Sequence, residues 1–112
     1  MVKAIVMHAP GGPEVLQWED VTVGEPGPGE ARVRNTAVGL NLLETLFRSG
    51  VIPMELPAIL GWEAAGVVDA VGAGVTGVRP GTRVAYFTAN GCYAEERLIN
   101  ADELVPLPDG IS

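Results

Sequence analysis

Few side chains in this sequence could take part in chemistry, and their spacing narrows the choice. Cys92 is the single cysteine and His8 the single histidine. They lie at opposite ends of the chain, and no third group orients them as a nucleophile and its base. A catalytic zinc ion needs three protein ligands of the cysteine, histidine or carboxylate type, which this pair cannot supply. We therefore expect no metal site and interpret Cys92 as a buried or edge cysteine.

A glycine-rich segment has the sequence pattern of a dinucleotide-binding loop. Residues 72–77 read Gly-Ala-Gly-Val-Thr-Gly, which matches the G-x-G-x-x-G pattern. That loop works only when a helix opens at its end, because the phosphate sits on the helix N-terminus. Here Val-Arg-Pro-Gly follows at once, and the proline and glycine prevent a helix from starting. The segment is therefore predicted to be a turn between two strands.

Asn41 has two good interpretations. It precedes residues 42–49, in which leucines and a phenylalanine recur with the period of a helix that Gly50 would close. Because Glu44 follows three residues on, Asn41 can cap the first turn while Glu44 reaches back to it. Alternatively, the Asn41 amide can donate to a carbonyl oxygen that gains negative charge in a reaction. From the residues alone, capping is the favoured role.

The elements that would position these residues are mostly strands. Fifteen glycines and nine prolines cut the sequence into short apolar pieces, which is typical of a sandwich or barrel. A loop is expected at residues 53–57, and the small apolar run at 64–71 suits a strand buried on both faces. The expected fold class is mainly β, a barrel-like domain with one or two short helices. Strands are predicted at residues 2–8, 15–21, 31–40, 64–71, 82–88, 93–99 and 104–107.

Composition excludes several classes of function. A length of 112 residues predicts one domain. The net charge of −7 disfavours nucleic acid and anionic membranes as partners, because both repel an acidic surface. The apolar runs are far shorter than the roughly 20 residues that cross a bilayer, and the N-terminus lacks the pattern of a signal peptide. A single cysteine allows no internal disulfide and fits a cytoplasmic location.

Three segments together resemble the quinone oxidoreductases related to zeta-crystallin. They are NLLETLFRSG at 41–50, GWEAAGVV at 61–68 and PGTRVAY at 80–86. This group is the zinc-independent branch of the medium-chain dehydrogenase/reductases. The resemblance implies that residues 1–112 form the N-terminal GroES-like catalytic domain, a partly open β-barrel. It also implies that the Rossmann cofactor domain and the C-terminal return segment are absent from these residues.

The resemblance implies a reaction as well. Complete enzymes of this group pass hydride from NADPH to a quinone or an enone, and this domain would supply the wall around the substrate. Asn41 matches an asparagine that lies near both nicotinamide and substrate, so it is the expected catalytic and cofactor-contacting residue. The chain by itself would bind no cofactor tightly and be inactive. The alternative is a non-enzymatic β-barrel scaffold or interaction module.

Four further residues are expected around the substrate by the same resemblance. They are Leu46, Ile52, Trp62 and Glu63. Leucine and isoleucine stand where relatives often carry tyrosines, which makes the pocket more apolar. Trp62 replaces a histidine that binds zinc in the zinc-dependent relatives. Judged by residue type alone, Glu63 is more often a structural carboxylate, and Arg48 more often covers the last carbonyls of a helix.

Absence of the return segment has a consequence for assembly. Strands that this segment pairs with in complete enzymes would become open edges, and the face toward the Rossmann domain would be uncovered. Open edges and apolar patches recruit other chains. We therefore expect the chain to self-associate, most simply as a dimer.

Overall fold

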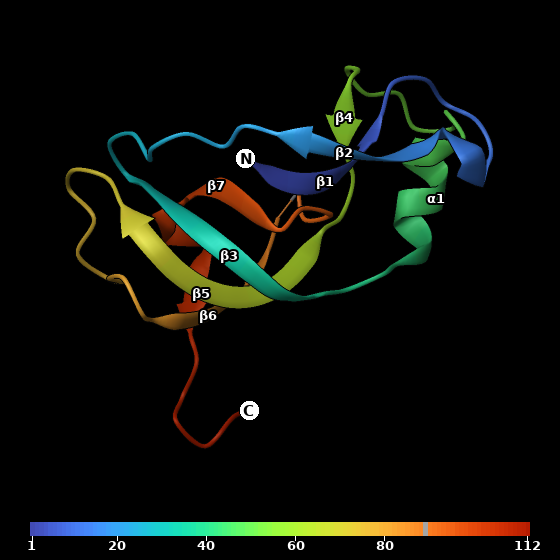
Figure 1. Ribbon diagram of the computed structural model, residues 1–112. Helices are drawn as coiled ribbons and strands as arrows, with labels where there is room; N and C mark the ends of the chain where they lie inside the picture. The colour runs from blue at the N-terminus through green and yellow to red at the C-terminus, as the bar shows by residue number, and fades with distance from the viewer. Residues whose placement is uncertain (89) are drawn as a thin grey trace.

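Two antiparallel sheets and one short helix make up the fold (Figure 1). The computed structural model describes residues 1–88 and 90–112. The smaller sheet has the order β2-β1-β4, and the larger has the order β7-β3-β5-β6-β8. The strands are β1 (Val2–Met7), β2 (Leu16–Val21), β3 (Glu30–Val38), β4 (Ala58–Ile59), β5 (Glu63–Val71), β6 (Arg83–Phe87), β7 (Glu96–Asn100) and β8 (Leu104–Pro106). The prediction of a mainly β GroES-like domain is confirmed.

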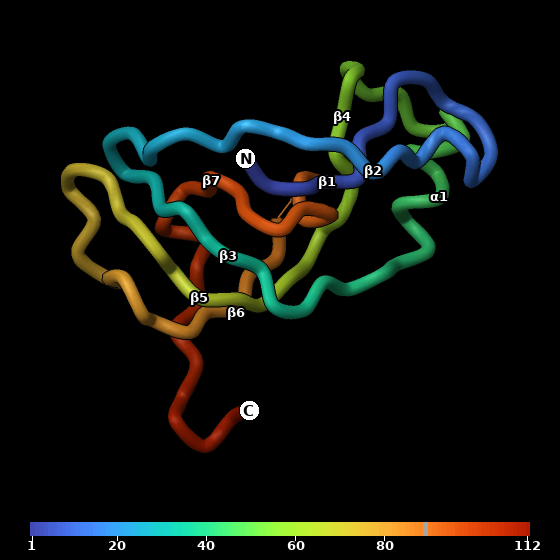
Figure 2. Tube along the Cα trace, viewed as in Figure 1, coloured from blue at the N-terminus to red at the C-terminus, as the bar shows by residue number. Residues whose placement is uncertain are grey.

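The segment before β7 joins the two sheets. The N–H of Ile5 in β1 donates to the carbonyl of Tyr93 at 2.8 Å, and the N–H of Glu95 donates to the carbonyl of Lys3 at 2.9 Å. Ala4 and Ala94 form a bridge at the same place. The sheets therefore continue into one another at this corner, which gives a partly open barrel rather than two separate layers (Figure 2).

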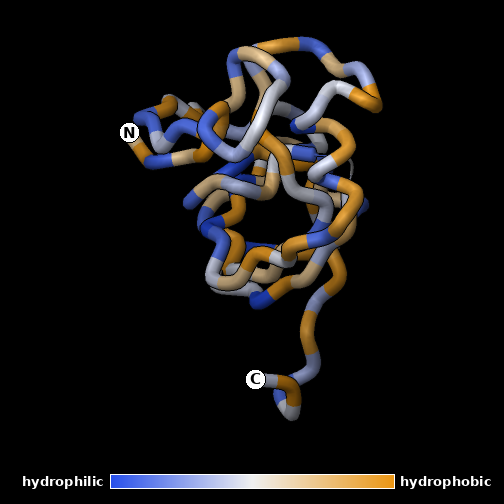
Figure 3. The backbone as a smooth tube through the Cα atoms, turned by 90° about the vertical axis from the view of Figure 1, so that its right-hand side faces the viewer, coloured by the Kyte–Doolittle hydropathy of each residue, from blue (hydrophilic) through white to orange (hydrophobic). Residues whose placement is uncertain are grey.

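The core lies on the inner face of the larger sheet. Along β5, Ala64, Gly66 and Val68 are buried, whereas Ala65 and Val67, which point to the opposite face, are only half-buried. The expectation that this strand is buried on both faces is therefore wrong, since its other face is partly open to solvent. Hydropathy alternates along much of the chain, as expected for strands with one buried face (Figure 3). The buried cluster comprises Ala31, Val33, Ala64, Val68, Val78, Val84, Tyr86, Cys92, Ile99 and Leu104.

The observed strands differ from the predicted ones in two places. The strand predicted at 93–99 begins only at Glu96, because residues 93–95 form backbone hydrogen bonds with β1. The two-residue strand β4, which pairs with the end of β1, was not foreseen. Its sequence is too short to show an alternating pattern. The other predicted strands are present within a residue or two.

The helix α1 (Leu42–Arg48) leaves the end of β3 through residues 39–41 and lies beside the smaller sheet (Figure 1). Gly50 follows it with a φ of 86°, a conformation that favours glycine. Two short 3-10 turns, Pro13–Val15 and Ala101–Glu103, complete the elements. Within residues 1–88 and 90–112, no helix has the length and apolar character that spanning a bilayer requires.

Candidate functional site

The site is built around the start of α1. Asn41 is extended and half-buried, and it forms a capping box with Glu44. The Glu44 carboxylate accepts the backbone N–H of Asn41 at 2.9 Å. In the same capping box the Asn41 side-chain oxygen faces the backbone N–H of Glu44, which also donates to the Asn41 backbone carbonyl at 3.2 Å. Capping involves only the oxygen of the Asn41 carboxamide, so its NH2 group is left as a donor for another partner.

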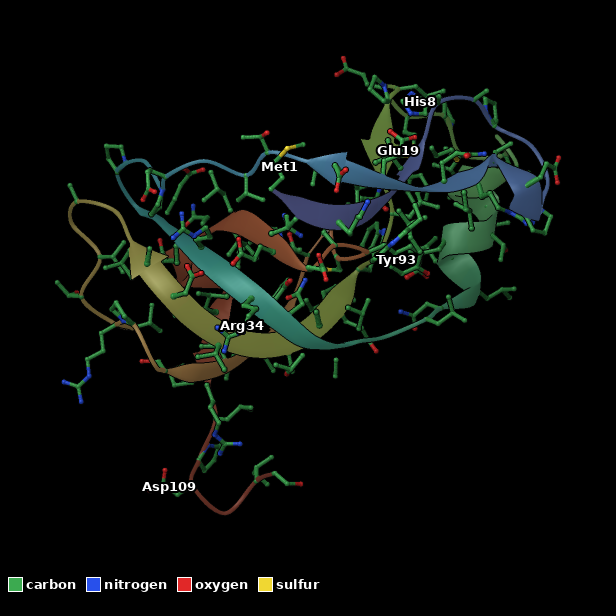
Figure 4. All side chains as sticks on the ribbon, in the orientation of Figure 1. Met1, His8, Glu19, Arg34, Tyr93 and Asp109 are labelled. Atoms are coloured by element: carbon green, nitrogen blue, oxygen red, sulfur yellow. The ribbon has the colours of Figure 1, made fainter. Side chains whose placement is uncertain are left out.

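Tyr93 is the neighbour of this capping box on the sheet side. It lies between the sheets and α1 (Figure 4), and its hydroxyl is buried. Burial, followed by the negative charge of Glu44, raises the pKa of Tyr93 to about 12. The phenol is therefore neutral at physiological pH and can act as a hydrogen-bond donor toward the carboxylate.

Three aromatic rings form a row that begins on α1. The Phe47 and Trp62 ring centroids are 6.1 Å apart, and those of Trp62 and Phe87 are 5.6 Å apart. Both spacings fall in the range of favourable tilted aromatic pairs. Phe87, at the end of β6, is 66 % exposed, so the row runs from the helix outward to solvent and offers a ring face there.

Two grooves flank the connection between β3 and α1. The β6 groove, of about 620 Å³, and the β2 groove, of about 480 Å³, share residues 37–39. Glu63 is the charged residue of the β6 groove and Glu95 that of the β2 groove. The β6 groove is lined by Ala37, Val38, Gly39, Glu63, Ala64, Ala65, Ala85, Tyr86, Phe87 and Val105. The β2 groove is lined by Ile5, Leu16, Trp18, Asn35, Thr36, Ala37, Val38, Gly39, Leu40, Tyr93, Ala94 and Glu95.

The residues predicted around the substrate do not all meet in one groove. Glu63 lines the β6 groove, where its side chain leaves no room for a Cβ on Gly39. Ile52 lies instead in a separate cavity of about 170 Å³. Phe47 lines that cavity too and contacts Trp62 on the other side, so it connects the two regions.

Leu46 is 37 % exposed on α1, and its carbonyl accepts the N–H of Ile52 at 3.1 Å. This bond ties the loop after the helix to the helix itself. Arg48, expected at the helix C-terminus, is the last helical residue, and its own carbonyl accepts the N–H of Gly11 at 2.8 Å. The helix is thus fastened at its end by backbone contacts to the rest of the domain.

Sequence reasoning missed four side chains of this site: Glu44 as a buried group, Phe47, Phe87 and Tyr93. The capping pattern pointed to Glu44, but nothing in it signalled burial. The three rings stand on separate segments, and no local pattern predicts that such segments meet. The one available signal was the rarity of aromatic residues, of which the chain has only two Phe, two Trp and two Tyr.

The glycine-rich segment 72–77 is a turn, as predicted. Its backbone is occupied within the domain: the N–H of Gly72 donates to Glu30 at 2.8 Å, and the carbonyl of Ala73 accepts the N–H of Gly29 at 2.9 Å. The segment leads into the loop before β6 rather than into a helix. It therefore lacks the free N–H groups at a helix start that bind phosphate.

His8 and Cys92 are far from being a metal or nucleophile pair. His8 lies at the end of β1, with its Nε2 2.7 Å from a carboxylate oxygen of Glu19 on β2 (Figure 4). Cys92 is fully buried, and burial raises the pKa of its thiol. In the part of the chain that the structure describes, no three histidine, cysteine or acidic side chains gather in a way that could hold a metal ion.

The two sheets, the helix α1 and the apolar grooves together have the architecture of a GroES-like domain. Residues 27–109 match the alcohol dehydrogenase GroES-like domain, and the chain belongs to this family. The resemblance to quinone oxidoreductases is confirmed by the relatives as well.

A quinone oxidoreductase of Pseudomonas aeruginosa is 51% identical over 99% of this chain and 35% of its own length. A 2-haloacrylate reductase of a Burkholderia species is 46% identical over 96% of this chain and 34% of its own length. The crystal structure of Escherichia coli quinone oxidoreductase complexed with NADPH superposes with a TM-score of 0.94 and 44% identity, over 98% of this chain and 34% of that one. The chain thus spans about a third of the length of these relatives.

Proposed function

We propose that residues 1–112 form the substrate-side domain of an NADPH-dependent oxidoreductase that reduces a quinone or an enone. The observation that carries the proposal is the half-buried Asn41 at the start of α1, whose capping box involves the carboxamide oxygen and leaves the NH2 group as a donor. Support also comes from the quinone oxidoreductase relatives and from the NADPH held by the Escherichia coli protein.

In this proposal each feature of the site has one task. NADPH, when bound, supplies the hydride. The Asn41 amide donates to the substrate carbonyl oxygen, where negative charge develops as hydride arrives. The apolar grooves exclude water, and the exposed face of Phe87 offers a planar substrate a surface for stacking.

The charges beside the grooves favour a neutral substrate. The groove linings contain a glutamate each, Glu63 and Glu95, and neither lining contains a lysine or arginine. A carboxylate substrate would therefore meet like charge without a compensating cation. Of the two reactions that the relatives' names describe, reduction of an uncharged quinone fits these residues better than reduction of an anionic haloacrylate.

Among these residues, only the nicotinamide end of NADPH would find a suitable partner. Asn41 is the residue that would meet the nicotinamide. The phosphates find no comparable place, because the glycine-rich turn opens no helix and the N–H groups of Gly72 and Val75 already donate within the domain. A Rossmann domain would have to hold them. We also propose that the reaction needs no zinc, and elemental analysis showing one zinc per chain after dialysis would contradict this.

The proposal is tested by joining this domain to a cofactor domain of the kind its relatives carry. We expect NADPH consumption that depends on a neutral quinone, and we expect Asn41→Ala to lower kcat strongly while weakening NADPH binding far less, because the cofactor domain would hold the phosphates. Activity that is unchanged in Asn41→Ala would overturn the role of Asn41. A complete protein that binds no NADPH in a fluorescence titration would favour the scaffold alternative instead.

A scaffold or interaction role has one observation in its favour. Several large apolar side chains are exposed, among them Leu40 at 83 % and Leu42 at 82 %. Such a surface is typical of a face that contacts another domain or chain. The same residues would face the cofactor domain in an enzyme, so the NADPH titration decides between the two functions.

A further inference from the structure

One buried carboxylate is not explained by the fold. Glu44 is 3 % exposed, and it is the one charged residue classed as buried among residues 1–88 and 90–112. Its Oε2 accepts the N–H of Asn41, whereas its Oε1 is buried without a hydrogen-bond partner in the described part of the chain. Burial of a carboxylate is costly unless hydrogen bonds compensate for the lost water. A single backbone bond at a helix cap does not account for that cost.

A hydrogen-bond donor that could pair with Glu44 Oε1 is the hydroxyl of Tyr93, which precedes β7. The Tyr93 hydroxyl is buried and has no partner among the described residues, and it lies close enough to Glu44 for the carboxylate to affect the pKa of the phenol. The Tyr93 backbone is fixed from two sides. Its N–H donates to Leu60 at 2.9 Å, and its carbonyl accepts the N–H of Ile5 at 2.8 Å. The ring therefore rises from the rigid corner where the two sheets join.

We propose that Glu44 and Tyr93 are positioning residues that fix the direction of the Asn41 side chain. In this arrangement the Tyr93 O–H would donate to Glu44 Oε1, while Glu44 Oε2 accepts the N–H of Asn41. Glu44 Oε1 and the Tyr93 hydroxyl, which both lack a hydrogen-bond partner within residues 1–88 and 90–112, would thereby pair with each other. The sheet corner would be connected to the backbone of the residue that acts on the substrate. The catalytic part of this inference rests on the proposed function, whereas the structural part does not.

The helix needs such an anchor. It has seven residues, and helices this short are not stable by themselves, so contacts must hold them in place. Its far end is fastened by the bond from Gly11 to the Arg48 carbonyl. At its start, Glu44 is the side chain that connects the first turn inward. Because a catalytic amide must be held to within a fraction of an ångström, the start is the end that matters for chemistry.

The structural part is tested on the chain of residues 1–112 by amide hydrogen exchange, read by NMR. In Glu44→Ala and in Tyr93→Phe, the Asn41 amide should exchange roughly tenfold faster relative to the core amides. Glu44→Gln keeps an acceptor oxygen and should stay near the unmodified chain. Ile99→Val, a core change that lowers stability elsewhere, is the matched control. Unchanged Asn41 exchange in Tyr93→Phe would overturn the proposal.

The catalytic part is tested in the complete enzyme. Glu44→Ala should lower kcat by about 10- to 100-fold, the scale of a misplaced catalytic group, with KM for NADPH nearly unchanged. Glu44→Gln should restore most of kcat. In an Asn41→Ala background, neither Glu44→Ala nor Tyr93→Phe should lower kcat further, because both act through Asn41.

A merely structural role gives a different result. Glu44→Ala would then lower stability and kcat to the same extent in the unmodified enzyme and in the Asn41→Ala variant. Ile99→Val would do the same. This result would show that the proposal is wrong. If the unmodified complete enzyme had no quinone reductase activity, the proposed function would be contradicted instead. The exchange experiment would still decide whether Glu44 and Tyr93 hold Asn41.

Discussion

Gly72 lies directly against the carbonyl oxygen of Gly27, so closely that a Cβ at position 72 would overlap this oxygen. The two glycines bring the turn after β5 onto the segment before β3, and the N–H of Gly72 donates to Glu30 there at 2.8 Å. The first glycine of the G-x-G-x-x-G pattern is thus required by backbone packing.

We predict that Gly72→Ala lowers the free energy of unfolding by about 1–3 kcal/mol, because backbone has to move to admit the methyl group. Gly74→Ala should cost about 1–2 kcal/mol, since Gly74 has a φ of 82°. Gly77→Ala is the matched control: its Cβ would meet nothing within 4 Å, so its cost should stay within about 0.5 kcal/mol. Urea titrations measure all three. If Gly74→Ala in a complete enzyme abolished NADPH affinity at an unchanged Tm, the segment would be a phosphate loop after all.

Asn41→Ala should have a small effect on stability. Caps contribute about 0.5–2 kcal/mol, and we expect the lower end because the Glu44 half of the capping box remains in place. Hydride transfer in a complete enzyme should nevertheless slow strongly. Denaturant titration and single-turnover kinetics separate the two effects. A loss of 2 kcal/mol or more would mean that Asn41 serves mainly as a cap.

Glu63→Gln should change substrate preference without changing the fold. Removing an exposed negative charge beside the β6 groove should raise kcat/KM for an anionic substrate about two- to fivefold and leave that of a neutral quinone unchanged. Added salt should reduce this difference, because screening weakens exposed charges. Equal effects on both substrates would show that Glu63 does not face the substrate.

Stability should decline in alkaline solution. Burial raises the pKa of Tyr93 to about 12 and raises that of Tyr86 as well. In the unfolded chain these phenols lose their protons near pH 10, whereas in the folded chain they keep them to higher pH. The unfolded state is therefore favoured as the pH rises from about 10 to 12. Tyr93→Phe should flatten this decline in urea titrations, and a decline of unchanged slope would contradict the burial of its hydroxyl.

The chain of residues 1–112 should self-associate and should not turn over NADPH with quinones. The strands β2 and β8 each end a sheet with an open edge, and Trp18 on β2 is 60 % exposed. Light scattering should detect a dimer at high concentration. If the dimer forms through β2, Trp18→Lys should weaken it. If the dimer forms through the exposed face of α1, Leu42→Lys should weaken it. A stable monomer would contradict the first half, and quinone-dependent NADPH oxidation the second.

Much of the fold could be read from local sequence. Glycines and prolines marked the turns, and alternation of apolar residues marked the strands, because a strand with one buried face must alternate. The helix followed from its period and from the Asn41–Glu44 pair, since capping depends on residues only three positions apart. The rejection of the glycine-rich loop was equally local, because it needed only the proline and glycine that follow.

Tertiary structure alone decided what these elements bring together. The row of Phe47, Trp62 and Phe87 joins a helix, a loop and a strand, and local patterns describe the face of one element without saying which faces meet. Residues 93–95 bond to β1 because its backbone groups offer them partners, while the Glu95 carbonyl still accepts the N–H of Asn35 in β3. The burial of Glu44 beside Tyr93 arises in the same way. A capping pattern fixes the bond to Asn41, but only packing of α1 against the corner of the two sheets removes the carboxylate from water.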